Sequence, residues 1–246
     1  PRGKANSVSF RDEIKSRLSA TLRWPVTRHF PQGIYFARDL GRFLRELEIE
    51  NIFDVGAHHG ESAIEYAALF PHARIDSFEP VRESFIELQR RTSRNPRVHC
   101  HNFALGSRSE NSKMDTTAIH SSSFKISNDG NEKVTIKTTV DFCRQHHIDR
   151  VNFLKIDTEG FDLEVLRGAE PLIENRDIDL IQVEAGMNPE NNFHVYFEHF
   201  TSYLHKYGYR IFGIYEQVSE PLARSAKLRR SNIVFASPSL TRIVHG

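Results

Sequence analysis

Short apolar runs alternate with amphipathic stretches from about residue 38 onward, and this alternation limits the folds open to the chain. Strand–helix alternation predicts an α/β architecture, with a mostly parallel sheet covered by helices on both faces. In such sheets ligands bind beyond the carboxyl ends of the strands. The predicted strands cover residues 51–55, 74–78, 97–105, 151–156, 179–183, 209–215 and 232–236, and the predicted helices cover 38–47, 61–69, 81–94, a stretch from about 162, and 193–207.

The length of the chain, 246 residues, suits one large domain with an appendage. We assign residues 1–38 to a basic N-terminal helical appendage and residues 39–246 to the main domain. Apolar residues recur at every fourth position of the appendage, which predicts an amphipathic helix that ends before Pro25. This helix is expected to pack on the main domain or on a second subunit, with peripheral contact to an anionic membrane surface as the alternative. The apolar positions are Phe10, Ile14, Leu18 and Leu22.

The charged residues nearly cancel, because 33 Lys and Arg against 32 Asp and Glu leave a formal net charge of +1. A dedicated nucleic-acid-binding protein usually has a larger positive surplus, so we expect no nucleic-acid partner. The 2 cysteines are too few for a disulfide framework or a cysteine-based zinc site, and a reducing, cytoplasmic location is expected. No apolar run approaches the roughly 20 residues that a membrane-spanning helix needs.

Residues 107–138 interrupt the alternation of strands and helices. This segment is polar and contains a serine run at 121–123 and the turn sequence Asn128-Asp129-Gly130. We expect a long loop or hairpin over the functional site, because long loops of this kind are often functional.

The motif Asp54-Val-Gly-Ala-His-His-Gly60 joins a predicted strand to a predicted helix. A dinucleotide-binding fold needs Gly-x-Gly-x-x-Gly there, because its second glycine lets the backbone approach a pyrophosphate. His58 occupies that position. The spacing Gly56-x-x-x-Gly60 therefore favours a ligand that lacks a phosphate and carries a positively charged amino-acid part. The alternative is a tight structural turn with a glycine at each bend.

Glu79 ends the next predicted strand, 25 residues after Asp54. A carboxylate at this point accepts both hydroxyl hydrogens of a ribose, as the acidic residue of dinucleotide-binding folds does. The alternative is a solvated charge at a strand end. The position of Glu79 between Phe78 and Pro80 disfavours that alternative.

A third motif, Phe153-Leu-Lys-Ile-Asp-Thr-Glu-Gly160, brings Asp157 and Glu159 to the end of an apolar strand. Two carboxylates so close together are costly unless they bind something cationic or polar. The alternative is that Asp157, Thr158 or Asp162 caps the following helix. We favour a role in the functional site for Asp157 and keep capping open for Asp162.

Together these motifs resemble the FkbM-type methyltransferase family. The resemblance covers roughly residues 50–215 and rests on Asp54-Val-Gly-Ala-x-x-Gly60, Phe78-Glu79-Pro80, Ala104-Leu-Gly106 and the third motif, which continues to Ala169. The family has the class I, Rossmann-like fold that uses S-adenosylmethionine, with a seven-stranded, mostly parallel sheet. It typically methylates hydroxyl oxygens of sugars or natural products, so the resemblance implies methyl transfer to such an acceptor.

The resemblance also implies roles for individual residues. Asp54, Gly56 and Gly60 would line the methionine part of the cofactor, Glu79 would hold its ribose, and Asp157 would face the reaction centre. The family commonly has Asn where this chain has His58, which leaves the contact made by that side chain open. The residues predicted to bind S-adenosylmethionine are Asp54, Gly56, His58, Gly60, Glu79, Pro80, Asn102 and Ala104.

A sugar hydroxyl is a poor nucleophile until a base accepts its proton, and a carboxylate or histidine within hydrogen-bond reach serves this purpose. Asp157 and Glu159 are the predicted catalytic residues, with Glu184, His58 and His59 as rivals. No metal ion is part of the prediction, although Asp157 and Glu184 at neighbouring strand ends leave metal assistance open.

Two other functions remain open at this stage. The first is a nicotinamide-dependent oxidoreductase or epimerase, which the missing glycine at His58 and the lack of a Tyr-x-x-x-Lys pair disfavour. The second is a binding module that kept the fold and lost the chemistry, which the intact set of carboxylates disfavours. Neither the acceptor nor the oligomeric state follows from the sequence.

Overall fold

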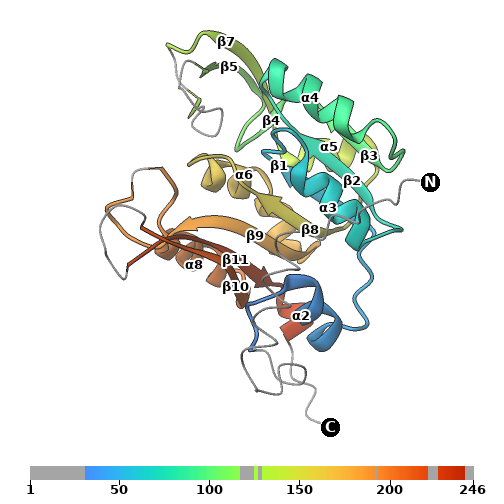
Figure 1. The fold of residues 1–246 in the computed structure, drawn as a ribbon, viewed down its shortest axis with the longest axis vertical. Coiled ribbons are helices and arrows are strands. Elements are labelled where there is room, and N and C mark those ends of the chain that lie inside the picture. The colour runs from blue at the N-terminus through green and yellow to red at the C-terminus, as the bar shows by residue number, and fades with distance from the viewer. Residues whose placement is uncertain (1–30, 117–124, 127–128, 192, 221–226, 242–246) are drawn as a thin grey trace, which may run out of the picture.

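The computed structural model describes residues 31–116, 125–126, 129–191, 193–220 and 227–241, so the helix predicted near the N-terminus lies outside the described residues. A seven-stranded sheet with the order β10–β11–β9–β8–β1–β2–β3 forms its centre (Figure 1). The five strands from β9 to β3 are parallel to one another, and β11 is antiparallel to both of its neighbours, β9 and β10. This arrangement confirms the predicted fold class. The strands are β1 (Asn51–Val55), β2 (Arg74–Phe78), β3 (Val98–His101), β8 (Val151–Ile156), β9 (Ile178–Gly186), β10 (Arg210–Ser219) and β11 (Leu228–Ala236).

The central strands are buried on both faces, as parallel strands under two helical layers must be. Successive side chains of a strand point to opposite faces, so Ile52 and Phe53 belong to two different hydrophobic clusters, as do Phe153 and Leu154. Helices α2 (Phe36–Phe43) and α3 (Glu61–Leu69) supply one cluster, and α4 (Arg82–Thr92) lies beside α3 (Figure 1). The helices that supply the other cluster are α5 (Thr139–His146), α6 (Asp162–Gly168), α7 (Glu170–Asn175) and α8 (Phe197–His205); a short helix, α9 (Pro238–Thr241), follows β11.

Helix α2 packs against the sheet at the start of the described chain. The Asp39 carboxylate is fully buried and accepts hydrogen bonds from the Gly33 N–H at 2.8 Å and from the Tyr215 hydroxyl at 3.1 Å. The Phe36 ring lies 5.0 Å from the ring of Phe153 on β8. The boundary drawn between residues 38 and 39 therefore falls inside a packed helix of the main domain.

The single strand predicted over residues 97–105 is wrong, because β3 ends at His101 and the chain then enters a second sheet. The Asn102 side chain donates to the carbonyl oxygens of Glu79 and Pro80, at 3.0 and 2.9 Å, and this accompanies the change of direction. The second sheet has the order β4–β7–β5–β6, and β5 and β7 pair antiparallel, so of the two alternatives for segment 107–138 the hairpin is confirmed and the long loop is wrong. Its strands are β4 (Ala104–Leu105), β5 (Glu110–Asp115), β6 (Lys125–Ile126) and β7 (Glu132–Lys137).

Two further differences concern helices. Helix α5 was not predicted, and α8 begins at Phe197 although the apolar spacing predicted a start at 193. The Asn191 side chain explains the late start, because its oxygen accepts the N–H groups of Phe193 and His194 and holds them in a turn. None of the helices within the described ranges is both long and apolar enough to span a lipid bilayer.

Candidate active site

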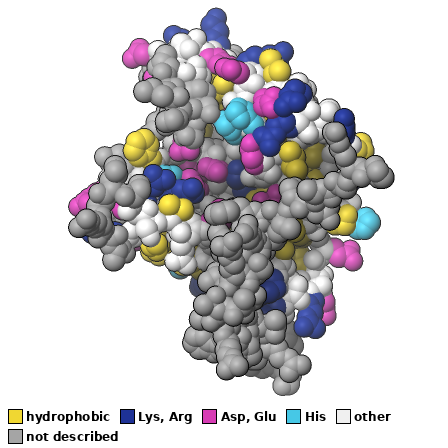
Figure 2. Space-filling view, viewed as in Figure 1, with side chains coloured by type: hydrophobic (Ala, Val, Ile, Leu, Met, Phe, Trp, Pro, Cys, Tyr) yellow, Lys and Arg dark blue, Asp and Glu magenta, His cyan; other side chains and the backbone are white. Residues whose placement is uncertain are grey.

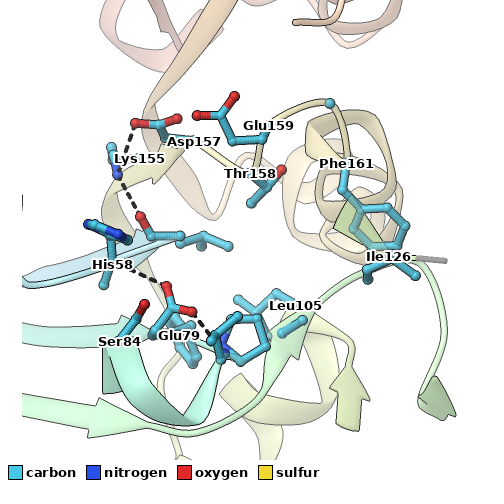
Figure 3. A pocket seen from close by; sticks show the side chains of 18 of the residues that line it. His58, Glu79, Ser84, Leu105, Ile126, Lys155, Asp157, Thr158, Glu159 and Phe161 are labelled. Atoms are coloured by element: carbon cyan, nitrogen blue, oxygen red, sulfur yellow. Dashed lines mark hydrogen bonds and ion pairs between the residues drawn. The ribbon is translucent and has the colours of Figure 1, made fainter. Parts of the chain in front are cut away.

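A cavity of about 540 Å³ lies at the carboxyl ends of β1, β2 and β8. This volume lies in the range that holds a small-molecule ligand. Figure 2 shows the hollow on one face of the molecule, with acidic side chains inside it and basic side chains close by. In Figure 3, Glu79 and His58 face the cavity from one side, Asp157 and Glu159 lie across from them, and the apolar side chains Leu105, Ile126 and Phe161 complete the wall.

The turn after β1 requires a glycine at position 56. Gly56 has a φ of +75°, and a Cβ atom placed there would lie only 1.9 Å from the carbonyl oxygen of Asp157. The turns that follow β1 and β8 therefore touch through their backbones. Gly60, with a φ of +86°, precedes α3 and lies behind the cavity wall against Leu88.

His58 also has a positive φ, +47°, in the left-handed region that Asn and His tolerate better than most residues. Its backbone N–H donates to the Glu79 carboxylate at 2.9 Å, while its ring stacks on the ring of His59. Burial and the neighbouring His59 lower the pKa of His58. The family's Asn and this chain's His are both suited to the turn, and the contact with Glu79 comes from the backbone.

Glu79 is nearly buried at the end of β2, with 6% of its surface exposed. Its two carboxylate oxygens accept the N–H groups of His58 and Val81, each at 2.9 Å. Burial raises the pKa of Glu79 to about 7, although the two backbone N–H groups oppose this shift. Pro80 and Ala104 line the cavity beside Glu79.

Lys155 is a buried residue of the site that the sequence reasoning missed. Its ammonium nitrogen lies 3.0 Å from Asp54, 3.6 Å from Asp157 and 3.2 Å from the Gly56 carbonyl oxygen. Burial alone would lower the pKa of Lys155, but the charges of Asp54 and Asp157 outweigh it and raise that pKa. Lys155 therefore carries a positive charge directly under the turn after β1.

Asp157 and Glu159 both face the cavity in the turn after β8 (Figure 3). Glu159 has a φ of +53°, a conformation that costs energy for a residue other than glycine and that clusters at functional sites. Burial and the charge of Asp157 raise the pKa of Glu159 to about 6. The Asp162 carboxylate holds the turn itself, because it accepts the N–H groups of Thr158 and Gly160 at 3.3 and 3.1 Å.

A cluster of polar side chains from β9, β11 and the segment before α8 lies beside Glu159. His194, which lines the cavity, lies with its Nε2 atom 2.8 Å from a Glu184 oxygen, and Arg230 binds the other Glu184 oxygen. One ligand atom from each of Glu159, Glu184 and His194 lies within 4.8 Å of the other two. A divalent cation could bridge such a group, but the Arg230 guanidinium already supplies the positive charge that Glu184 needs. Asp157, named beside Glu184 in the sequence analysis, does not belong to this group.

The structure thus brings together most of the residues predicted for the site. The cavity wall contains Gly56, His58, Glu79, Pro80, Ala104, Asp157 and Glu159. Three predicted residues do not line it: Asp54 pairs with Lys155, Gly60 begins α3 and lies against Leu88, and Asn102 donates to the carbonyl oxygens of Glu79 and Pro80. His194 and Arg230 carried no motif that would have identified them.

The sheet order, the antiparallel β11 and a cavity at the carboxyl ends of β1, β2 and β8 define a class I methyltransferase domain. Residues 54–211 match the model of the methyltransferase FkbM domain. The chain belongs to the FkbM methyltransferase domain family, as the sequence motifs predicted.

Among the relatives is the hexuronic acid methyltransferase AglP of Haloferax volcanii, which is 27% identical over 153 residues. That alignment covers 60% of this chain and 62% of AglP, so the chain matches less than two thirds of that relative.

Solved structures with a similar chain trace include an uncharacterized protein from Listeria monocytogenes serotype 4b, with a TM-score of 0.48, 9% identity, and coverage of 81% of this chain and 66% of that one. Another is TrmK of M. capricolum in complex with S-adenosyl-homocysteine, with a TM-score of 0.47, 8% identity, and coverage of 81% and 67%.

Proposed function

We propose that this chain transfers a methyl group from S-adenosylmethionine to a hydroxyl oxygen of a sugar. The observation that carries the proposal is one cavity with Glu79 at the end of β2 and the carboxylates Asp157 and Glu159 after β8. The cofactor supplies a methyl group on a positively charged sulfur, and the protein supplies position and electrostatics.

The residues of the cavity fit the parts of this cofactor. The Glu79 carboxylate keeps lone pairs beyond the two that accept backbone N–H groups, and ribose hydroxyls are suitable donors to them. Pro80, Val81, Ala104 and Leu105 form an apolar pocket next to it that suits an adenine ring. The turn at Gly56, between Glu79 and Asp157, would hold the methionine part.

Glu159 is the better of the two candidate bases. A general base works best when its pKa lies near the working pH, and the pKa of Glu159 is raised to about 6. The Asp157 carboxylate already lies 3.6 Å from the Lys155 ammonium, whereas no such ion pair engages Glu159 in the described part of the chain. In this mechanism the acceptor hydroxyl gives its proton to Glu159, and the negative charge of Asp157 faces the reaction centre.

Calorimetric titration with S-adenosylmethionine, S-adenosylhomocysteine and NAD tests the cofactor. Methyl transfer is then measured on glycans that contain a hexuronic acid, because AglP is named for that acceptor, with a neutral glycan and an RNA as control substrates. A hexuronic acid offers hydroxyl and carboxyl oxygens. A methyl ether survives mild alkali and a methyl ester does not, so an alkali-labile product would refute transfer to a hydroxyl.

Glu79 is expected to make the affinity for S-adenosylmethionine depend on pH. The ionised carboxylate is the better acceptor for ribose hydroxyls, and the pKa of Glu79 is about 7 in the free protein. Affinity should therefore fall as the pH drops below 7, by up to about tenfold per pH unit. Glu79→Gln should weaken binding by about ten- to a hundredfold and remove this pH dependence, as calorimetry at pH 6, 7 and 8 would show. Equal pH profiles for the two proteins would remove Glu79 from the ribose-binding role.

Phe193 is expected to contribute to acceptor binding. Its side chain lines the cavity and is 57% exposed, and it directly precedes His194, which lies near Glu159. An aromatic face packs well against the C–H face of a sugar ring. Phe193→Ala should raise the KM for the glycan by about three- to tenfold and leave kcat and cofactor affinity near normal. Phe43→Ala, at an exposed phenylalanine on α2, is the matched control.

A further inference from the structure

The side-chain amide of Asn191 has a fixed orientation. Its oxygen accepts the backbone N–H groups of Phe193 and His194, at 2.9 and 3.2 Å. Its nitrogen donates to the carbonyl oxygen of Arg229 at 3.1 Å. A flipped amide would face two donors with its NH₂ group and a carbonyl with its oxygen, so the hydrogen-bond network permits one orientation only.

This orientation determines which nitrogen of His194 carries the proton. The Asn191 nitrogen lies 3.1 Å from His194 Nδ1, and an NH₂ group only donates, so Nδ1 accepts. The Asn191 oxygen lies 3.3 Å from the same nitrogen but already accepts two backbone N–H groups. In the neutral ring the proton is then on Nε2, and this N–H donates to Glu184 at 2.8 Å.

His194 and Arg230 both bind Glu184, and one ligand atom of His194 lies within 4.8 Å of one of Glu159. Both lower the pKa of Glu159, whereas burial and the charges of Asp157 and Asp162 raise it. The groups that face Glu159 are thus Asp157 after β8, Asp162 on α6, Glu184 on β9, His194 in the segment before α8, and Arg230 on β11.

We propose that His194, held by Asn191 with its proton on Nε2, is a positioning residue that acts with Arg230 to orient the Glu159 carboxylate toward the acceptor hydroxyl. Placing Glu159 next to an acceptor rests on the proposed function. The tautomer of His194 and its effect on Glu159 do not, because both exist in the protein without ligands. His194 itself does not take the acceptor's proton, since one ring nitrogen accepts from Asn191 and the other already carries a proton.

Nitrogen NMR of the ligand-free protein labelled with ¹⁵N-histidine tests the tautomer. Loss of signals in His194→Gln assigns the ring, and in the neutral ring we expect an unprotonated Nδ1 and a protonated Nε2. In Asn191→Asp the carboxylate only accepts, so the proton should move to Nδ1 or occupy both nitrogens. A proton on Nδ1 in the wild-type protein would overturn the proposal.

Carbon NMR of the protein labelled with ¹³C-glutamate tests the effect on Glu159, with Glu159→Gln used to assign the signal. His194→Gln and Arg230→Gln should each move the midpoint of the Glu159 titration to higher pH, because each loses a group that favours the carboxylate. His199→Gln, at an exposed histidine on α8, should leave it unchanged. Unchanged midpoints in both test variants would overturn the proposal even in an inactive protein.

Methyl transfer provides the functional comparison. A misplaced base costs about a hundredfold in rate, so His194→Gln should lower kcat by roughly that factor and leave the affinity for S-adenosylmethionine unchanged. The acid limb of its pH–rate profile should move to higher pH, in step with the Glu159 titration. A wild-type kcat and profile in His194→Gln would refute the positioning role, whereas absence of methyl transfer by the wild type refutes the proposed function alone.

Discussion

Glu159→Gln is expected to lower kcat by about 10²–10⁴-fold, which is the usual contribution of a general base. The variant keeps the size of the side chain and removes its ability to accept a proton. In the wild type, kcat/KM for the glycan at saturating S-adenosylmethionine should rise with pH through about 6, because Glu159 must be ionised to act and its pKa is raised to about that value by burial and Asp157. This acid limb should be missing from Glu159→Gln.

Asp157→Asn is the matched comparison for the role of Glu159. It removes a negative charge from the same cavity, so a loss of rate is expected, but the acid limb that belongs to Glu159 should remain. Because Asp157 raises the pKa of Glu159, the limb should move to lower pH in this variant. Affinity for S-adenosylmethionine, measured by calorimetry, separates a loss of chemistry from a loss of binding. If Glu159→Gln is fully active and Asp157→Asn loses the acid limb, the base is Asp157.

Lys155→Met is expected to lower the free energy of unfolding by about 3–5 kcal/mol, the usual cost of removing one partner from a buried ion pair. Lys155 is 4% exposed and Asp54 is fully buried, so Asp54 would be left as an uncompensated charge. The Gly56 carbonyl oxygen would lose its contact with the ammonium group as well. Urea unfolding followed by circular dichroism measures the change.

A double variant distinguishes a lost ion pair from a lost packing contact. Asp54→Asn removes the charge that Lys155→Met leaves behind, so the double variant should recover part of the stability lost in Lys155→Met. Lys206→Met, at an exposed position after α8, should change the free energy of unfolding by less than about 0.5 kcal/mol. If Lys155→Met is as stable as Lys206→Met, the ion pair with Asp54 does not stabilise the fold.

Most of the main sheet was predictable because strands such as β1 and β8 are short, largely apolar runs, whereas β3 is not such a run and its bounds were missed. The runs at 51–55, 74–78 and 151–156 match β1, β2 and β8 residue for residue. Strands buried on both faces need such continuous apolar runs. The strand–helix alternation then implied the parallel pairing, since parallel neighbours require a crossover connection.

The small sheet was harder to predict because its strands are largely polar. In β5 and β7 the buried residues are Met114, Val134 and Ile136, and the other positions are exposed or half-buried. So few apolar residues give no clear alternation, and the pairing depends on contacts with the main domain. Helix α5, in contrast, left a signal that was overlooked: Thr138 followed three residues later by Asp141 is a helix-start pattern, and the Thr138 side chain accepts the Asp141 N–H.

The strand-end carboxylates of the site were predictable from their positions, but their partners were not. Asp54 and Lys155 are directly paired in the register of β1 and β8, although they stand about a hundred residues apart in sequence. That register is a tertiary property. His194 and Arg230 come from a turn and from an antiparallel strand, and only the folded sheet brings them to Glu159.

The close approach of Gly56 to the Asp157 carbonyl oxygen couples the proposed cofactor-binding turn to the turn that carries Glu159. A side chain added at position 56 would displace the turn after β8, so a single substitution would disturb the proposed cofactor site and the proposed base together. A substitution in either turn must therefore be compatible with the backbone of the other turn. Residues 193–195 also line the cavity but belong to neither turn. Substitutions there could change the acceptor preference without displacing the two turns.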